Sequence, residues 1–154
     1  MYRNPTSNKV VVLNSINAVC DMWPFMLTGL EELRKPSKAR ESTTATDFLA
    51  TLMRIVTSHS GVIMVLTSKN NKPIGFVVAQ QSVERCSIQL IAAYINDKCP
   101  DALLELRDAL EEWSRQHGFT EIRAYTRRIN GSAMRWYEKR LGFQREFVGF
   151  VKTL

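Results

Sequence analysis

Three apolar, β-branched runs decide the fold of this chain: VIMVLT (residues 62–67), IGFVVA (74–79) and SIQLIAAYI (87–95). Short runs of this composition, bounded by turn residues, are typical of β-strands. The first two are joined by KNNKP (69–73), which favours a turn, and the last two by polar residues at 82–86. The sequence therefore predicts a meander of three consecutive strands at the centre of the chain.

Upstream of this meander, the sequence predicts one strand and two helices. Residues 9–13, KVVVL, form another β-branched run, and Ser15 is placed to cap a helix that continues to residue 34. Pro24 falls inside that helix and is expected to kink or split it. Thr44 opens a sequence resembling a capping box, and apolar residues at helical spacing then predict a second helix that ends near residue 60.

Downstream, helical and strand periods alternate. Residues 100–118 carry leucines on one helical face, with Pro100 in the first turn and Gly118 at the end. Residues 120–126 predict a strand, a helix capped at 130 or 132 runs to 140, and residues 143–154 predict a last strand. The order is β-α-α-β-β-β-α-β-α-β. We expect an α/β fold (an α+β mixed sheet) in which helices flank a central mixed sheet on both faces.

Length and composition indicate one folded domain. The chain has 154 residues, of which 45% are hydrophobic and 23% charged. A chain of this kind buries a core without disulfides or metal and is not disordered. No apolar run approaches the ~20 residues of a membrane span, and the first residues lack the features of a signal peptide. We expect a single domain over residues 1–154, in the cytoplasm and without a membrane partner.

Metal and disulfide chemistry are not predicted. Cys20, Cys86 and Cys99 are odd in number and irregularly spaced, and only two histidines could join them as metal ligands. We expect the three cysteines to be reduced and packed. His59 and His117 lie at predicted helix ends, where an imidazole bonds terminal carbonyls, so neither is predicted to be catalytic.

The net charge of +6, from 21 basic and 15 acidic residues, is concentrated at the carboxyl end. Residues 119–154 hold 8 basic and 3 acidic residues (+5), whereas residues 81–118 hold 4 and 7 (−3). Charge placed in this way favours a local anionic ligand, and a nucleic-acid partner is not favoured. The basic cluster could hold a phosphate, contact an acidic partner or be an ordinary solvated face. Its members are Arg123, Arg127, Arg128, Arg135, Lys139, Arg140 and Arg145.

A motif near the carboxyl end carries a resemblance to a known family. The segment Asn130-x-x-Ala133-x-x-x-Tyr137-Glu138-Lys139-Arg140-Leu141-Gly142-Phe143 resembles the last helix and final strand of the GCN5-related N-acetyltransferase (GNAT) family. The segment EWSRQHGF (112–119) is similar to the end of that family's central helix and the strand that follows. The element order matches over nearly the whole chain, and residue-level similarity covers about residues 74–143.

The resemblance implies where acetyl-CoA would bind. In the family, the fourth strand diverges from the fifth, and the pantetheine arm lies in the gap. The matching residues imply that the backbone of Ile91, Ala92 and Ala93 holds that arm, that Lys98 lies at the pyrophosphate, and that Asn130 lies near the sulfur.

The segment at 98–103 departs from the family pattern. The family binds pyrophosphate on a Q/R-x-x-G-x-G/A loop that opens the central helix, because glycines let backbone amides approach the anion. Here Lys98 keeps the basic position, but no glycine follows it. Asp101, expected at the second helical position, would set a carboxylate against the anion, and Leu103 would crowd its approach. Pro100 and Asp101 are equally explained as an ordinary helix start.

The resemblance also implies a general acid. Tyr137 matches the tyrosine that returns a proton to the coenzyme A thiolate in many family members. Because Arg140 makes the Tyr-to-Gly spacing one residue longer than the commonest form, counting back from Gly142 reaches Glu138 instead. One residue turns a helix by about 100°, so the sequence leaves open which of the two side chains faces inward.

No general base is evident. Gln89 cannot accept a proton usefully, Glu84 falls in a turn, and Glu121 begins a strand, where a solvated role is expected.

The sequence thus predicts an acetyl-CoA-dependent N-acetyltransferase that acts on a small-molecule or protein amine, with Tyr137 as the acid. The alternative is a catalytically inactive GNAT-like binding or structural module, of the kind that phages encode, whose basic carboxyl-terminal face contacts an acidic partner. Phe147 and Phe150 in the last predicted strand could pack across a homodimer.

Overall fold

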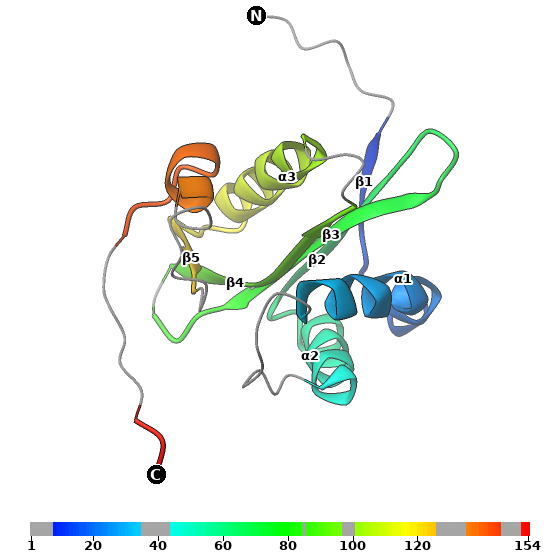
Figure 1. Cartoon of the computed structure of the whole chain (residues 1–154), viewed down its shortest axis with the longest axis horizontal. Helices are drawn as coiled ribbons and strands as arrows, with labels where there is room; N and C mark the ends of the chain where they lie inside the picture. The colour runs from blue at the N-terminus through cyan, green and yellow to red at the C-terminus, as the bar shows by residue number, and fades with distance from the viewer. Residues whose placement is uncertain (1–7, 35–43, 85, 97–100, 126–134, 146–151) are drawn as a thin grey trace, which may run out of the picture.

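The computed structural model describes residues 8–34, 44–84, 86–96, 101–125, 135–145 and 152–154. Its helices and strands follow the predicted order (Figure 1). They are β1 (Lys9–Val12), α1 (Ile16–Arg34), α2 (Ala45–Ser58), β2 (Gly61–Thr67), β3 (Pro73–Gln81), β4 (Ser87–Ile95), α3 (Ala102–Gln116), β5 (Glu121–Ala124) and η1 (Trp136–Arg140). The last of these, η1, is a short π-helix.

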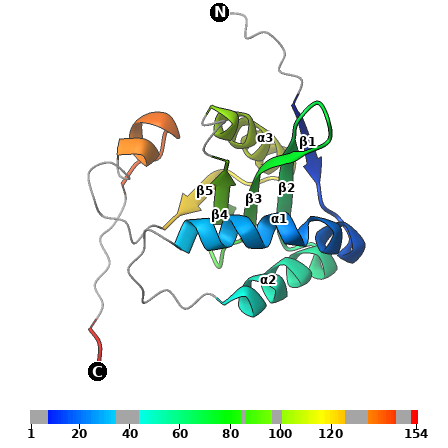
Figure 2. The same ribbon diagram turned by 45° about the vertical axis from the view of Figure 1, so that its right-hand side comes forward.

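Among the described residues, a five-stranded mixed sheet forms the middle layer, with the order β1-β2-β3-β4-β5. Strands β1 to β4 pair antiparallel, and β5 joins β4 in parallel. Helices α1 and α2 cover one face of the sheet, and α3 and η1 lie on the other (Figures 1 and 2). The predicted mixed sheet, the central meander and the helices on both faces are therefore confirmed.

The sheet is buried on both faces, which explains why residues 62–67 are apolar throughout instead of alternating. One apolar cluster lies between the sheet and α1 and α2, and a second lies between the sheet and α3. The first includes Val19, Met26, Phe48, Leu52, Ile63, Val65, Phe76 and Val78. The second includes Val62, Met64, Leu66, Val77, Ile88, Leu103, Leu106 and Leu110.

Helix α1 approaches β3 and β4 closely at Gly29. A Cβ atom there would lie 2.5 Å from Phe76 Cε1 and 2.7 Å from Tyr94 Cδ1, both well inside van der Waals contact. Only glycine lets the helix pack directly on these two rings.

The predicted helix starts are confirmed by hydrogen bonds. The Ala18 amide donates to Ser15 Oγ at 3.1 Å, and the Asp47 amide donates to Thr44 Oγ1 at 3.1 Å. Each hydroxyl satisfies a backbone donor that has no partner within its own helix.

Pro24 does not split its helix, so that alternative of the prediction is wrong. Helix α1 runs unbroken from Ile16 to Arg34 with Pro24 on its exposed side. Val19 and Met26, before and after the proline, are both fully buried in the same core. Packing of both halves against the sheet offsets the backbone hydrogen bond that proline removes.

The carboxyl end departs from the prediction or lies outside the described residues. Strand β5 is shorter than the predicted 120–126. Of the predicted last strand, residues 143–145 and 152–154 are described and are not in a strand. The rest of that strand, with Phe147 and Phe150, lies outside the described residues, as do residues 130–134 of the predicted last helix.

Cys20 and Cys86 are free, as predicted, but both are exposed, so the expectation that they are packed is wrong. Cys20 lies on the solvent side of α1, and Cys86 lies in the turn before β4. Cys99 lies outside the described residues.

Candidate functional site

Strand β4 is paired with β5 over only part of its length. The parallel register joins Ser87 to Glu121 and ends where Leu90 pairs with Ala124. Strand β4 continues to Ile95 and stays paired with β3 on its other side. Within the described chain, residues 91–95 therefore have no strand on the β5 side. We call these five residues the open segment of β4.

A β-bulge begins the open segment. Val78 pairs with Ala92 and Ala79 pairs with Leu90, which leaves Ile91 as an extra residue in β4. A bulge bends its strand and increases the local twist. Because it falls one residue beyond the last β4–β5 pair, it turns β4 where its pairing with β5 ends.

The bulge also changes which side chains face which helix. Before it, Ile88 and Leu90 contribute to the core under α3. Without a bulge, residues 92 and 94 would continue on that face. Instead Ile91, Ala92 and Tyr94 pack on the α1–α2 side, and Ala93 and Ile95 pack on the α3 side. Tyr94 thus joins Phe25 and Phe76, with ring centroids 5.9 and 5.7 Å away.

The structure places Ile91, Ala92 and Ala93, the predicted pantetheine contacts, in the open segment. Lys98 and Asn130, predicted to contact other parts of the cofactor, lie outside the described residues. The bulge was not anticipated from the sequence, because the continuous apolar run of β4 has no alternation in which an extra residue could be seen.

The start of α3 differs from the prediction in two ways. Asp101 is the N-cap and not the second helical residue, and its side chain makes no capping hydrogen bond. Its carboxylate is 86% exposed and lies 3.5 Å from Arg140 Nη1. Leu103 is buried in the core under α3 and does not crowd the helix start. Leu103 is drawn inward because its position shares the helix face of Leu106 and Leu110.

Helix η1 accounts for the extra residue between Tyr137 and Gly142. A π-helix makes i→i+5 hydrogen bonds, so its turn holds one more residue than an α-helical turn. Gly142, with φ +75°, then ends the turn as predicted, and the Phe143 amide donates to the Tyr137 carbonyl at 3.0 Å. The longer spacing that the sequence showed is thus taken up by backbone geometry.

Of the two candidates for the inward position, Tyr137 is the more enclosed. Its ring is half-buried and meets Phe143 edge-on, with centroids 5.8 Å apart. Glu138 is exposed and accepts from Arg145 Nη2 at 2.9 Å. Arg107 of α3 donates to the Arg140 carbonyl at 2.8 Å, which ties η1 to α3. The structure therefore favours Tyr137 over Glu138 as the side chain turned toward the protein.

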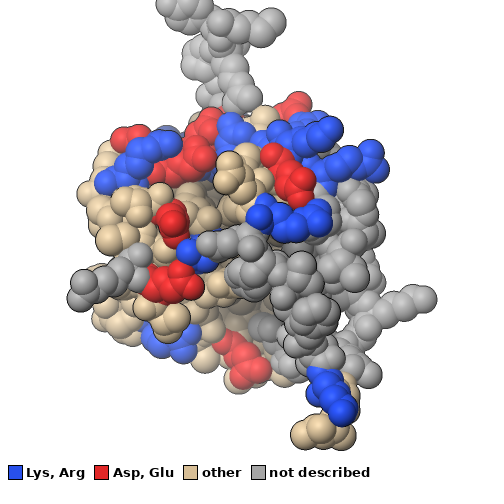
Figure 3. Space-filling view, turned by 90° about the vertical axis from the view of Figure 1, so that its left-hand side faces the viewer, with Lys and Arg blue, Asp and Glu red and all other residues tan. Residues whose placement is uncertain are grey.

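The described members of the basic cluster are largely engaged by acidic residues. Arg123 pairs with Glu84 and Glu121, Arg140 with Asp101, and Arg145 with Glu138. Arg127 and Arg128 lie outside the described residues. On the face that includes the β5 edge, Figure 3 shows Lys and Arg side chains intermixed with Asp and Glu. Mixed charge of this kind gives little of the single-sign field that nucleic acids require.

None of the three residues considered as a general base is suited to that role. Gln89 is half-buried and pairs in register with Arg123. Glu84 lies 2.7 Å from Arg123 Nη2. Glu121 accepts a hydrogen bond from Ser87, which, with the nearby Arg123 guanidinium, holds the pKa of Glu121 below its ordinary value. Glu121 is exposed, as expected of a solvated residue, and it also contacts Ser87 and Arg123.

The two histidines lie at the carboxyl-terminal ends of α2 and α3. His59 is the C-cap of α2, and His117 Nδ1 lies 2.8 Å from the Trp113 carbonyl, as predicted for a helix end. Both line a hollow of about 420 Å³ that contains no residue of β4 or β5 and so lies apart from the open segment.

No group of metal-ligating side chains occurs among the described residues. No helix in the described part of the chain is long and apolar enough to cross a membrane.

This architecture is the GNAT fold. A mixed sheet is covered on both faces, and the described pairing of its parallel strands ends at Leu90 and Ala124. Solved structures of acetyltransferases show the same arrangement over nearly their whole length.

Three of these structures illustrate the similarity. A possible acetyltransferase from Clostridium difficile 630 has a TM-score of 0.72 at 10% identity, with 96% of this chain and 97% of that chain covered. Aminoglycoside N-acetyltransferase AAC(6')-Iy in complex with CoA has 0.70 at 17% identity, with 99% of each chain covered. Ribosomal-protein-alanine N-acetyltransferase from Brucella melitensis biovar Abortus 2308 has 0.67 at 12% identity, with 96% and 99% covered. No protein-family profile and no curated protein matches this sequence.

Proposed function

We propose that this protein transfers an acetyl group from acetyl-CoA to an amine. The observation that carries the proposal is the open segment of β4, whose backbone has no strand on the β5 side among the described residues. An extended chain of amides can bond such an edge as an added strand would. The pantetheine arm of coenzyme A has this chemistry. Several solved structures with this fold are named as N-acetyltransferases, two of them in complex with CoA or a CoA bisubstrate analogue.

The residues present fit coenzyme A at both ends of the open segment. At one end, the exposed backbone of Ile91, Ala92 and Ala93 would hold the pantetheine amides. At the other end, the Asp101 side chain makes no capping hydrogen bond to α3 and forms an ion pair with Arg140. Arg140 would offset part of the repulsion between the Asp101 carboxylate and an anion bound at this helix start. We assign the pyrophosphate to this end, with Lys98 as its basic partner, and place Asn130 near the sulfur.

Acetyl-CoA would supply an activated acetyl thioester. In the proposed mechanism, the phenolic hydroxyl of Tyr137 supplies a proton. It donates that proton to the thiolate that leaves when the acceptor amine has attacked the acetyl carbon. Because none of Glu84, Gln89 and Glu121 is suited to act as a base, we propose that the acceptor arrives as a neutral amine or loses its proton through water.

The acceptor is proposed only as a class, a small-molecule or protein amine. Solved structures with this fold include acetyltransferases named for aminoglycosides and for a ribosomal-protein alanine. We propose that one domain spans residues 1–154 and works in the cytoplasm, which agrees with two free cysteines in the described chain.

Calorimetry with acetyl-CoA tests the proposal directly. We expect a dissociation constant in the micromolar range, which corresponds to roughly −8 kcal/mol. The absence of any heat at millimolar acetyl-CoA would refute the proposal and leave the inactive binding module as the better account.

Tyr137→Phe tests the assigned acid once an accepted amine is found. We expect it to lower kcat by about a hundredfold or more while the affinity for acetyl-CoA changes little, because only the proton donor is removed. Glu138→Gln is the matched control on the adjacent residue and is expected to keep kcat. Equal loss in both variants, or no loss in Tyr137→Phe, would remove Tyr137 from the mechanism.

A further inference from the structure

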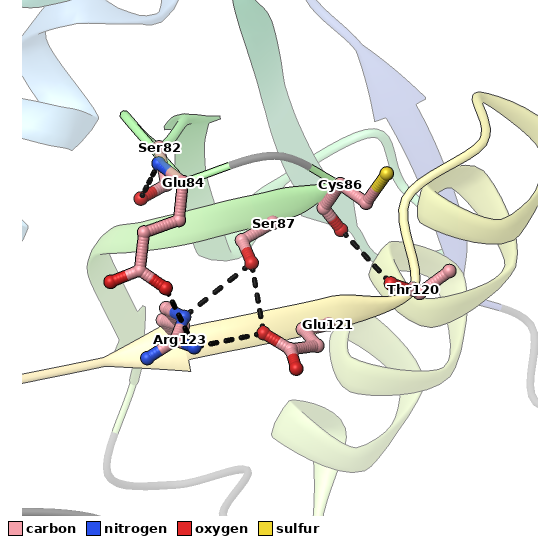
Figure 4. Close-up of polar contacts among 7 residues, drawn as sticks. All are labelled: Ser82, Glu84, Cys86, Ser87, Thr120, Glu121 and Arg123. Carbon is pink, nitrogen blue, oxygen red and sulfur yellow. Dashed lines mark hydrogen bonds and ion pairs between the residues drawn. The ribbon is translucent and has the colours of Figure 1, made fainter.

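A polar network joins β5 to β4 at the end opposite to the open segment (Figure 4). Its centre is Arg123 of β5, whose side chain is only 15% exposed. Arg123 Nη2 lies 2.7 Å from Glu84 Oε2 and 3.0 Å from Glu121 Oε2. Its Nε donates to Ser87 Oγ at 3.4 Å. Ser87, itself fully buried, donates its hydroxyl hydrogen to Glu121 Oε2 at 2.9 Å.

Backbone hydrogen bonds reinforce this end of the strand pair. The carbonyl of Cys86 accepts from the amides of Thr120 and Glu121 at 2.8 and 3.2 Å, and from Thr120 Oγ1 at 3.4 Å. We call the side chains of Glu84, Ser87, Glu121 and Arg123, together with the Cys86 carbonyl, the β4–β5 clasp. It links three parts of the fold: the turn after β3, the start of β4 and, beyond α3 in the chain, the start of β5.

Strand β5 has few other means of attachment within the described chain. It has four residues, pairs in parallel and lies at the edge of the sheet. Parallel pairing is slightly weaker for each residue than antiparallel pairing, and short edge strands are marginal. None of its four residues is fully buried. Hydrophobic burial therefore contributes less to β5 than to β2 or β3, and charge-assisted hydrogen bonds contribute more.

The network joins one cation to two anions and a hydroxyl. One guanidinium, largely removed from water, faces two carboxylates and a buried hydroxyl, and each of these accepts one of its N–H groups. The two carboxylates are about half exposed, with 52% of Glu84 and 55% of Glu121 accessible, so water screens part of their attraction. The buried members, Arg123 and Ser87, make the clasp a specific attachment of β5 to β4 within the described chain.

We infer that the β4–β5 clasp positions the two strands for cofactor binding: by fixing their starts together, it sets their separation along the open segment. The inference rests on the proposed function, since the open segment is the proposed pantetheine site. Arg123 and its partners act through the strands and do not touch the reacting atoms in this scheme. They are positioning residues.

Amide hydrogen exchange in the protein without ligand tests the attachment by itself. In Arg123→Met we expect the amides of residues 122–124 to exchange about tenfold faster or more, while the amides of β2 keep their protection. Arg123→Lys keeps the charge but not the branched donor, so we expect an intermediate rate. Glu84→Gln, at an exposed turn position, is the variant least able to prevent folding, and we expect a smaller acceleration at the same amides.

Binding and kinetics test the consequence for the cofactor. We expect Arg123→Met to weaken coenzyme A binding by about tenfold to a hundredfold and to raise the KM for acetyl-CoA, because misplaced strands hold the arm poorly. A residue that only maintained the folded fraction would lower kcat and leave KM and the dissociation constant unchanged. Arg115→Met is the matched control, since Arg115 forms an exposed ion pair on α3, 3.8 Å from Glu112.

The outcomes separate the two proposals. The positioning role is supported if amide exchange is faster only in β5 and coenzyme A binding is weaker. The acceleration of exchange should be largest in Arg123→Met, smaller in Arg123→Lys and smallest in Glu84→Gln. Unchanged exchange in Arg123→Met, or faster exchange with unchanged coenzyme A affinity, overturns it. If the unmodified protein binds no coenzyme A, the proposed function and the positioning role fail together. Protected β2 amides in the same protein would show that it is folded and that unfolding does not cause this failure.

Discussion

Along β4, residues 87–90 have a strand on both sides, whereas residues 91–95 have one only on the β3 side within the described chain. The first half is tied to β5 by buried Ser87 and nearly buried Arg123. The second half begins with a bulge and carries residues that are only half-buried. The comparison shows that one strand can provide rigidity in one half and backbone hydrogen-bonding capacity in the other, with a single extra residue marking the change.

Deleting Ile91 should abolish the difference between the halves and have the largest effect. Without the bulge, Tyr94 would turn from Phe25 and Phe76 toward the α3 side. We expect a loss of at least about 4 kcal/mol of unfolding free energy, a large share of what a domain has, so the variant should fail to fold. Circular dichroism and urea denaturation measure this.

Deletion of Asn70 is the control for a chain shortened by one residue. Asn70 lies at the exposed tip of the β2–β3 hairpin, where loops tolerate changes in length. A native-like stability for the Ile91 deletion would show that the register of β4 is not fixed by Tyr94.

The two halves should respond differently to the same substitution. Ile88 in the first half is fully buried, whereas Ile95 in the second is only half-buried. We expect Ile88→Ala to lower the free energy of unfolding by about 2–5 kcal/mol, because it leaves a cavity in the core under α3. For Ile95→Ala we expect about 1 kcal/mol or less, since a half-buried side chain loses less transfer free energy than a fully buried one. Urea denaturation of both variants decides this, and equal losses would contradict it.

Low pH should weaken the attachment of the first half of β4 to β5. We expect the loss of stability to be smaller than that caused by the Ile91 deletion or Ile88→Ala. Glu121 has a lowered pKa in the folded protein because of Ser87 and Arg123, so its charged form stabilises the fold. That contribution is present above the unfolded-state pKa of about 4.3 and is lost as pH falls through the lower folded-state value. Glu84 also faces Arg123, so substitution of Glu121 alone is needed to isolate its contribution.

The measurement is the difference in unfolding free energy between the unmodified protein and Glu121→Gln as a function of pH. We expect the unmodified protein to be more stable at neutral pH and the difference to shrink below about pH 4. A difference that stays constant down to about pH 3 would show that Glu121 has an ordinary pKa.

The fold could be predicted from the sequence where periodicity and turn chemistry agree. Residues 62–67 and 74–79 are apolar because both faces of the sheet are covered, and Ser15 and Thr44 cap the helices that the spacing indicates. Pro24 misled the prediction because a local rule, the missing backbone donor, is outweighed by tertiary packing on both sides of it.

The candidate site was less predictable, since its geometry depends on register and on contacts between distant residues. An apolar strand hides a bulge, so no pattern in residues 87–95 marks Ile91 as the extra residue. The spacing around Arg140 did show an extra residue near Tyr137, but only the backbone reveals that a π-helix absorbs it. The clasp could have been suspected from Glu121 and Arg123, which are two residues apart and share one side of a strand.

Gly29 and Ile91 constrain one another although they lie on different elements. The bulge places the Tyr94 ring against α1, and the ring leaves no space for a Cβ atom at position 29. A relative whose β4 lacked the extra residue would turn the side chain at the position of Tyr94 away and would be free to carry alanine or a larger residue in α1. In an alignment of relatives, we therefore expect glycine at this helix position to be inherited together with the length of the fourth strand.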